Sequence, residues 1–264
     1  MRLVIQAGGR SRRSGLRAAA RRGCLGSALF LGVLATGCSR GEPRVPPRAE
    51  PGAQRVNLVG ADPVYQILPS AAAFSDRLPE RLRESPPGDA TPFGNRVARI
   101  SGTIRIRAVD RGDDLLPDPP YTRDEARVTA EFTTADGTQW RIRQTRVAAR
   151  LPDGSPRLFA GVGMDQLVHG DTGRENPLMP KMEAALTMWG FADVFKDGEL
   201  VKRDALLHIM LTSRARDLED GHYLDYDVSG QPVQEIHLFL NPGNQLPAPG
   251  GFLHVNWERS KMEP

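Results

Sequence analysis

Alternation of apolar and polar residues over Arg99–Ala108 constrains the fold of this chain more than any other sequence feature. In this run, RISGTIRIRA, the even-numbered residues are apolar or small, and the odd-numbered residues are arginine, serine or threonine. A period of two is typical of a β-strand with one buried face. The run therefore predicts a half-buried strand. Its polar face, with Arg99, Arg105 and Arg107, either binds an anion or a polymer such as a glycan, or simply keeps the surface soluble.

The next two apolar-polar runs, ARVTAEFTT and TQWRIRQTRVAA, flank a turn sequence that ends in Gly137. A three-residue loop with Gly137 in the left-handed conformation places Phe132 opposite Trp140. A two-residue loop would place Phe132 opposite Arg141 instead. Because paired residues share a face, the apolar pattern favours the three-residue loop.

Several further short strands follow, separated by Gly, Asp and Pro turns, without helices long enough to connect parallel strands. This organisation predicts an all-β fold, an antiparallel β-sandwich or barrel-like domain over residues 96–260. No glycine motif that cradles a phosphate or a dinucleotide is present in the sequence.

The first 37 residues have the composition of a signal peptide. Seven arginines and no acid precede Cys24, and the thirteen uncharged residues Cys24–Thr36 are too few for a membrane span, which needs ~20. Subtracting these seven charges from the formal net charge of +3 leaves −4 for the rest of the chain. The basic balance therefore belongs to the leader, and we expect no nucleic acid as a partner.

The segment Leu34-Ala35-Thr36-Gly37-Cys38 resembles a bacterial lipobox, in which small residues precede a cysteine that becomes the lipidated N-terminus. The resemblance implies that Cys38 carries palmitate-type acyl chains. Ser39 is not the aspartate that retains some lipoproteins in the inner membrane, so the resemblance implies an outer-membrane anchor facing the periplasm. A plain secreted protein is the alternative. Since Cys24 and Cys38 are the two cysteines of the chain, processing leaves no thiol for a disulfide or a catalytic role.

Two segments separate the leader from the predicted domain. Residues 38–56 are rich in proline and arginine, as in a solvated tether. Residues 57–95 predict an N-terminal extension with one short helix, which Pro79 would end or kink.

Three of the five histidines fall within predicted strands. His208 shares a face with Met210, and His237 and His254 lie on comparable faces of the next two strands. If these strands are neighbours, three imidazoles and a thioether converge, a donor set that suits copper or zinc. The alternative is that these are core residues whose rings bond backbone carbonyls.

The run HIMLTS resembles the His-x-Met segment of small periplasmic copper chaperones. The resemblance covers about a dozen residues, and only His208 and Met210 match it. It implies that these two side chains bind copper(I).

The loop from Asp165 to Pro180 holds the second group of candidates, Asp165, His169 and Asp171. A carboxylate beside a histidine can form a general base, and aspartate with asparagine can bind a hard cation. The alternative is a solvated connection punctuated by glycine and proline.

No nucleophile motif is present in the sequence. We therefore expect a membrane-anchored periplasmic lipoprotein that acts as a non-catalytic binding or envelope-associated module, with a small ligand or an envelope protein as its partner. The alternative is a periplasmic copper- or zinc-binding protein that uses the strand histidines.

Overall fold

A computed structural model describes residues 53–70, 91–111, 122–148, 161–176, 179–217, 219 and 221–263. Residues Pro47–Pro264 form one compact unit. The described residues contain nine strands and three short 3-10 helices, without an α-helix. The strands are β1 (Gln54–Ile67), β2 (Val97–Asp110), β3 (Glu125–Thr133), β4 (Gln139–Val147), β5 (Val162–Val168), β6 (Met182–Lys196), β7 (Glu199–Ser213), β8 (Val233–Leu240) and β9 (Leu253–Met262). The 3-10 helices are η1 (Gly170–Thr172), η2 (Pro242–Asn244) and η3 (Pro249–Gly251). Within the described ranges, no helix has the length and apolar character needed to cross a membrane.

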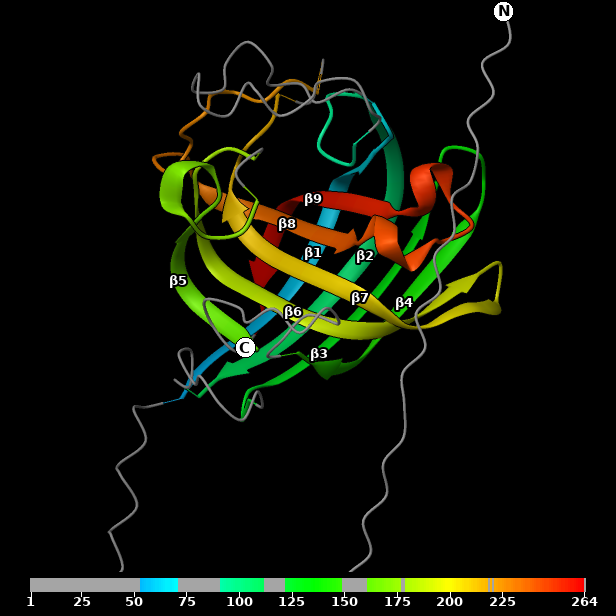
Figure 1. The fold of residues 1–264 in the computed structure, drawn as a ribbon, viewed down its shortest axis with the longest axis horizontal. Helices are drawn as coiled ribbons and strands as arrows, with labels where there is room; N and C mark the ends of the chain where they lie inside the picture. The colour runs from blue at the N-terminus through cyan, green and yellow to red at the C-terminus, as the bar shows by residue number, and fades with distance from the viewer. Residues whose placement is uncertain are drawn as a thin grey trace, which may run out of the picture. The chain divides into compact units, whose positions relative to one another are not determined.

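All the strands belong to one antiparallel sheet that closes on itself (Figure 1). The strand order is β4-β3-β2-β1-β9-β8-β7-β6, and β6 pairs back with β4 to complete the ring. The strand β5 pairs with the first half of β6, and β4 pairs with the second half. The prediction of an all-β antiparallel fold is therefore confirmed, and the ring of pairing corresponds to its barrel-like alternative.

Side chains fill the interior of the barrel. Inward positions of most strands form one apolar cluster, in which Ile104, Ile142, Leu207, Leu238 and Trp257 are almost fully buried. Small barrels of this kind are filled by side chains and hold a core in place of a lumen.

The predicted alternation and hairpin register are confirmed. On β2 the even-numbered residues from Ile104 to Ala108 are buried, while Arg105 and Arg107 are exposed. In the β3–β4 hairpin, Phe132 pairs with Trp140, and Gly137 has φ 85°.

The N-terminal boundary of the domain differs from the prediction. Residues 54–67 form β1, which pairs with both β2 and β9, so the sheet begins within the predicted tether and extension. The pairing with β9 shifts register between Ala61 and Val64, but the pairing with β2 does not, and buried Leu58 and Val64 keep the same face. The sequence shows no alternation here because the buried face includes Gln66 and the opposite face includes Val59 and Pro63. The predicted helix falls on residues 71–90, outside the described residues, as do the leader and Cys38.

Candidate functional site

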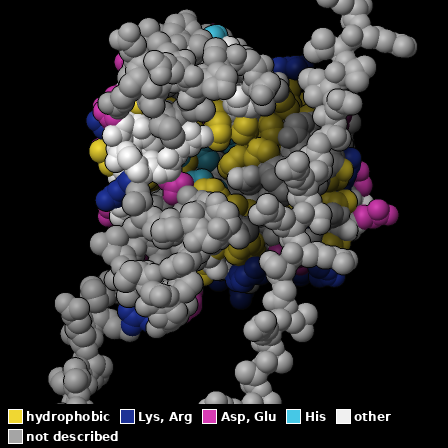
Figure 2. Space-filling model, viewed as in Figure 1, with side chains coloured by type: hydrophobic (Ala, Val, Ile, Leu, Met, Phe, Trp, Pro, Cys, Tyr) yellow, Lys and Arg dark blue, Asp and Glu magenta, His cyan; other side chains and the backbone are white. Residues whose placement is uncertain are grey.

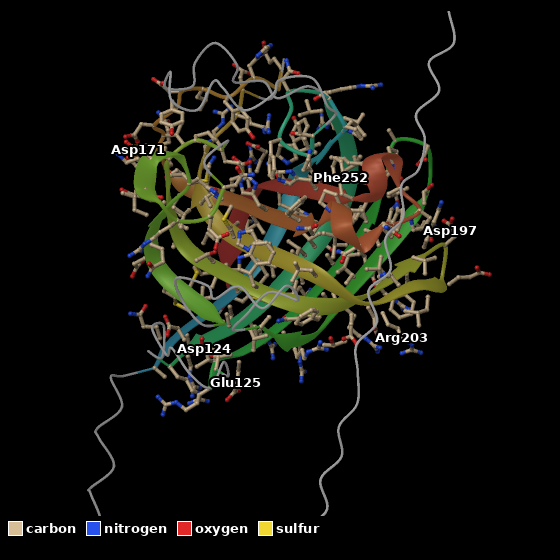
Figure 3. The ribbon with its side chains drawn as sticks, in the orientation of Figure 1. Asp124, Glu125, Asp171, Asp197, Arg203 and Phe252 are labelled. Carbon is tan, nitrogen blue, oxygen red and sulfur yellow. The ribbon has the colours of Figure 1, made fainter. Side chains whose placement is uncertain are left out.

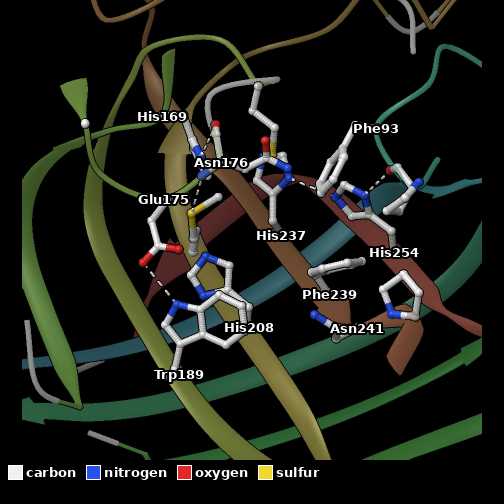
Figure 4. A pocket seen from close by; sticks show the side chains of 15 residues that line it. Phe93, His169, Glu175, Asn176, Trp189, His208, His237, Phe239, Asn241 and His254 are labelled. Carbon is white, nitrogen blue, oxygen red and sulfur yellow. Dashed lines mark hydrogen bonds between the residues drawn. The ribbon is translucent and has the colours of Figure 1, made fainter. Parts of the chain in front are cut away.

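A pocket of about 560 Å³ lies on the outer wall of the barrel, over β6 to β9. Outward-facing side chains of these strands form its floor, and its rim comes from the segment around Phe93, the loop after β5 and the turn after β8 (Figure 4). In the space-filling view, histidine side chains are visible in this hollow among apolar ones (Figure 2). The lining residues are Pro92, Phe93, His169, Gly173, Glu175, Asn176, Met179, Trp189, His208, Met210, His237, Phe239, Asn241, Pro242 and His254.

The sheet register arranges the floor of the pocket in two rows that cross the strands. The first row runs Trp189–His208–Phe239–His254, from β6 to β9. The second row runs Thr187–Met210–His237–Asn256 over the same strands. Because side chains alternate between faces, the neighbours of these residues along each strand point into the barrel core.

Three side chains on the pocket floor form a chain of contacts. His254 Nδ1 lies 2.8 Å from the carbonyl oxygen of Pro92, so this nitrogen carries the proton and Nε2 is an acceptor. His237 Nδ1 lies 3.4 Å from His254 Nε2 and is therefore assigned as the donor. This assignment leaves a lone pair on His237 Nε2, which lies 3.1 Å from Glu235 Oε1.

The protonation states of this chain follow from burial. Desolvation raises the pKa of Glu235, which is fully buried, and so favours the protonated carboxyl beside His237. Burial, together with the nearby His254, lowers the pKa of His237 far below its ordinary value. Burial also lowers the pKa of His254 to about 3. Both imidazoles are therefore neutral at physiological pH.

Glu235 is held by two further groups. The backbone N–H of Ala215 donates to Oε2 at 3.0 Å, and the Asn256 amide donates to Oε1. The buried guanidinium of Arg216 donates to the Gly221 carbonyl at 2.7 Å and stacks over the Tyr223 ring. The first two contacts hold the Glu235 carboxyl in place behind the pocket floor. The Arg216 contacts hold the neighbouring segment around Gly221 and Tyr223.

His169 enters the pocket from the loop after β5. Its Nδ1 lies 3.1 Å from the Asn176 carbonyl oxygen and 3.2 Å from the Asn176 backbone nitrogen, so either tautomer finds a partner there, and its Nε2 lies 3.4 Å from Met210 Sδ. Burial lowers the pKa of His169 to about 4, and the nearby His208 contributes in the same direction. The loop thus presents a third neutral imidazole.

His208 and Trp189 form a flat, stacked pair on one side of the pocket. Their ring centroids lie 4.1 Å apart, with planes 14° from parallel. His208 Nδ1 lies 2.9 Å from the Met188 carbonyl oxygen, and Trp189 Nε1 donates to Glu175 Oε1 at 3.1 Å. Both rings are therefore fixed in orientation before any ligand binds.

The structure brings the four predicted strand residues to one pocket, although not to one point. His237 and His254 are diagonal neighbours, whereas Phe239 stands between His208 and His254 in the first row. Met210 contacts His169. Across the described part of the chain, no group of three or more His, Cys, Asp or Glu side chains is set closely enough to hold a metal ion.

Of the three loop candidates, only His169 lines the pocket. Asp165 is exposed, has φ 52°, and falls at a position that β5 leaves out of its pairing with β6. Asp171 is exposed on η1, at the margin of the molecule (Figure 3). The predicted irregular loop also begins too early, because β5 continues to Val168.

Sequence reasoning did not select Phe93 or Trp189 as site residues, and Glu175 was noted only as one of the polar residues of the candidate loop. Trp189 lies in an almost wholly buried strand without an alternating pattern. The sequence therefore does not indicate that its side chain points away from the barrel core. Glu175, with φ 60°, and Phe93 reach the pocket from segments without regular structure.

Comparison with known proteins adds no relative to this description: no protein-family model, no curated protein and no solved structure matches the chain.

Proposed function

We propose that this protein is a non-catalytic binding module of the bacterial envelope, and that the pocket over β6–β9 takes a small, uncharged organic ligand. The observation that carries the proposal is the pocket itself. Its volume of about 560 Å³ falls in the range of ~300–1,000 Å³ that is usual for small-molecule sites. A single ion needs far less space.

The chemistry of the wall supports an uncharged ligand. Phe93, Trp189 and Phe239 supply apolar surface, and His169 and His254 are kept neutral by burial. Apart from the Glu175 carboxyl, which accepts from Trp189, the wall offers hydrogen bonds without a charge, so an anionic ligand would lose its hydration here without gaining an ion pair.

The lipobox-like sequence at Cys38 supports an anchored module facing the periplasm. We favour a small ligand over an envelope protein as the partner of the pocket, because the site is concave.

Methionine methyl groups provide the test. In residues 47–264 labelled with [¹³C-methyl]methionine, Met179 and Met210 report on the pocket, whereas the exposed Met262 lies outside it. Indole is the uncharged probe, with benzoate and benzylammonium as charged probes of similar size. We expect indole to shift the Met179 and Met210 signals in a saturable manner and to leave Met262 unchanged.

A matched pair of variants locates the binding. Phe93→Ala removes part of the rim and should weaken indole binding at least about fivefold, as expected for the loss of roughly 1 kcal/mol or more of aromatic contact. Phe195→Ala removes a half-buried phenylalanine of β6 that lies outside the pocket, beside Arg141, and should leave binding unchanged. Shifts that are absent with every probe, or equal in the two variants, would rule out the pocket as the ligand site.

Metal binding is a second candidate, favoured by the distance between His237 Nδ1 and His254 Nε2. Two nitrogens bound to one tetrahedral ion at ~2.0–2.1 Å lie about 3.4 Å apart, which equals the 3.4 Å observed. If Glu235 loses its proton, His237 Nε2 becomes the donor, and two lone pairs then face each other. Copper(I) or zinc could replace the proton between them.

Metal content separates the two candidates. After loading with copper(I) or zinc and desalting, one bound equivalent that disappears in His237→Gln but persists in the exposed His222→Gln would support the metal function. Metal-free protein that still binds indole would leave the organic ligand as the function.

A further inference from the structure

Outward positions of β2, β3 and β4 carry a second feature, remote from the pocket. The period of two that buries the core residues of these strands leaves their arginines exposed. In Figure 2, Lys and Arg side chains gather along the lower margin of the molecule. We call the following six exposed residues the arginine face: Arg99, Arg105, Arg107, Arg127, Arg141 and Arg143.

The register concentrates positive charge on this face. Arg107 lies directly opposite Arg127 in the β2–β3 pair, and like charges at opposite positions destabilise a sheet. Among the described residues, ion pairs form at Arg105 and Arg143, with Glu263 and Asp193, and none forms at Arg107 or Arg127. Two glutamates of β3, Glu125 and Glu131, are also exposed on this face, and Glu125 pairs with Arg111, so Arg107 and Arg127 have no ion-pair partner among the described residues.

Part of the arginine face is held in place. The Arg141 guanidinium lies 4.3 Å from the centroid of the Phe195 ring, and Arg143 lies 5.7 Å from the same centroid. Stacking orients the planar fork while its N–H groups stay available for bidentate contact with a phosphate.

We propose that the arginine face binds a membrane surface rich in anionic phospholipid headgroups. The argument from charge is complementarity: the chain after the leader has a net charge of −4, yet this face is basic. A membrane is favoured over a dissolved anionic polymer because of the anchor, and in this respect the inference rests on the lipidated Cys38 of the proposed function.

The reach of the tether supports this assignment. From Cys38 to the start of β1 at Gln54 there are 54 − 38 = 16 residues, which span at most ~55 Å when fully extended. The neighbouring Arg55 is exposed and pairs with Val109, two residues from Arg107. The chain thus enters the barrel beside the arginine face.

The ring order places this face opposite the pocket. Four steps separate β3 from β8 in either direction around the closed sheet, through β2, β1 and β9 or through β4, β6 and β7. A barrel that lies on the membrane through β2–β4 therefore presents its pocket to the aqueous side.

Vesicle sedimentation tests the proposal. Residues 47–264 are used because they form one compact unit and lack Cys38, so binding does not depend on acylation. We expect binding to vesicles of phosphatidylglycerol mixed with phosphatidylcholine, weakening with added salt, and little binding to phosphatidylcholine alone. The double variant Arg107→Thr/Arg127→Thr should lower the partition coefficient about 25-fold, or about fivefold for each arginine.

Arg174→Thr is the control, because Arg174 is exposed on the loop after β5, on the pocket side of the barrel. It should leave partitioning nearly unchanged. Equal binding to both kinds of vesicle, or an unaffected double variant, would overturn the proposal. So would binding to heparin without binding to vesicles, which would assign the face to a polymer. Indole binding is measured in a separate experiment. A failure of the arginine face to bind vesicles is therefore distinguished from a failure of the pocket to bind a ligand.

Discussion

His169 combines two unusual properties in one residue, a left-handed backbone and a buried imidazole. Its φ is 63°, and its pKa is lowered to about 4 by burial. The unfolded chain, with the ordinary pKa of 6.5, binds a proton between these values, whereas the folded protein does not. The stability that His169 contributes is therefore complete above pH 6.5 and decreases as the pH falls toward 4.

His169→Asn tests this dependence, because asparagine adopts a positive φ more often than most residues and does not titrate. The free energy of unfolding of the wild type, minus that of the variant, should decrease by about 1.4 kcal/mol for each pH unit below 6.5. Urea unfolding at a series of pH values measures this difference. The buried Glu235 and Glu258 are present in both proteins, so their own titration drops out of the difference, while His208 and Glu175 shift the pKa of His169 in opposite directions. A constant difference across this range would show that His169 titrates normally.

At the scale of the element, the β3–β4 hairpin depends on the backbone of Gly137. Its φ is 85°, and a Cβ there would meet no atom within 4 Å, so a substitution is penalised by conformation alone. Gly137→Ala should cost about 1–2 kcal/mol and lower the Tm by several degrees. Gly230→Ala is the control, because that position is equally open and has no left-handed φ. Equal melting temperatures for the two variants would contradict the assigned turn.

The same hairpin shows which elements the sequence could predict. Strands β2 to β4 have one buried face, and the pairing of Phe132 with Trp140 follows from that pattern. By contrast, β1 mixes polar and apolar residues on both faces, and β6 is buried on both faces, so neither has a readable alternation.

Contacts in the candidate site could likewise be predicted only where they depend on spacing along one strand. The shared face of His208 and Met210 was predictable from spacing, but the separation of His208 from His254 by Phe239 depends on strand order. The approach of His169 to Met210 depends on the path of a loop, for which a period gives no information.

At the scale of the whole molecule, the filled interior depends on small residues beside Trp257. A Cβ on Gly60 would lie 2.5 Å from Ile104 Cγ2 and 2.9 Å from Trp257 Cγ. Gly60→Ala should therefore destabilise the barrel by about 1–3 kcal/mol through overpacking. Gly60→Ala/Ile104→Ala removes the shorter of these two clashes and leaves the one with Trp257, so the double variant should lose at least about 0.5 kcal/mol less than the sum of the single losses, as measured by denaturant unfolding. Strict additivity would mean that the interior adapts without strain.

Alternation along β7 gives one strand two independent roles. Leu207, Ile209 and Leu211 hold the barrel together, while His208 and Met210, the residues between them, face the pocket. Substitutions at the pocket positions can therefore change the chemistry of the outer wall without disturbing the packing that lets the chain fold. A barrel built in this way can vary its outer surface over evolutionary time on an unchanged scaffold.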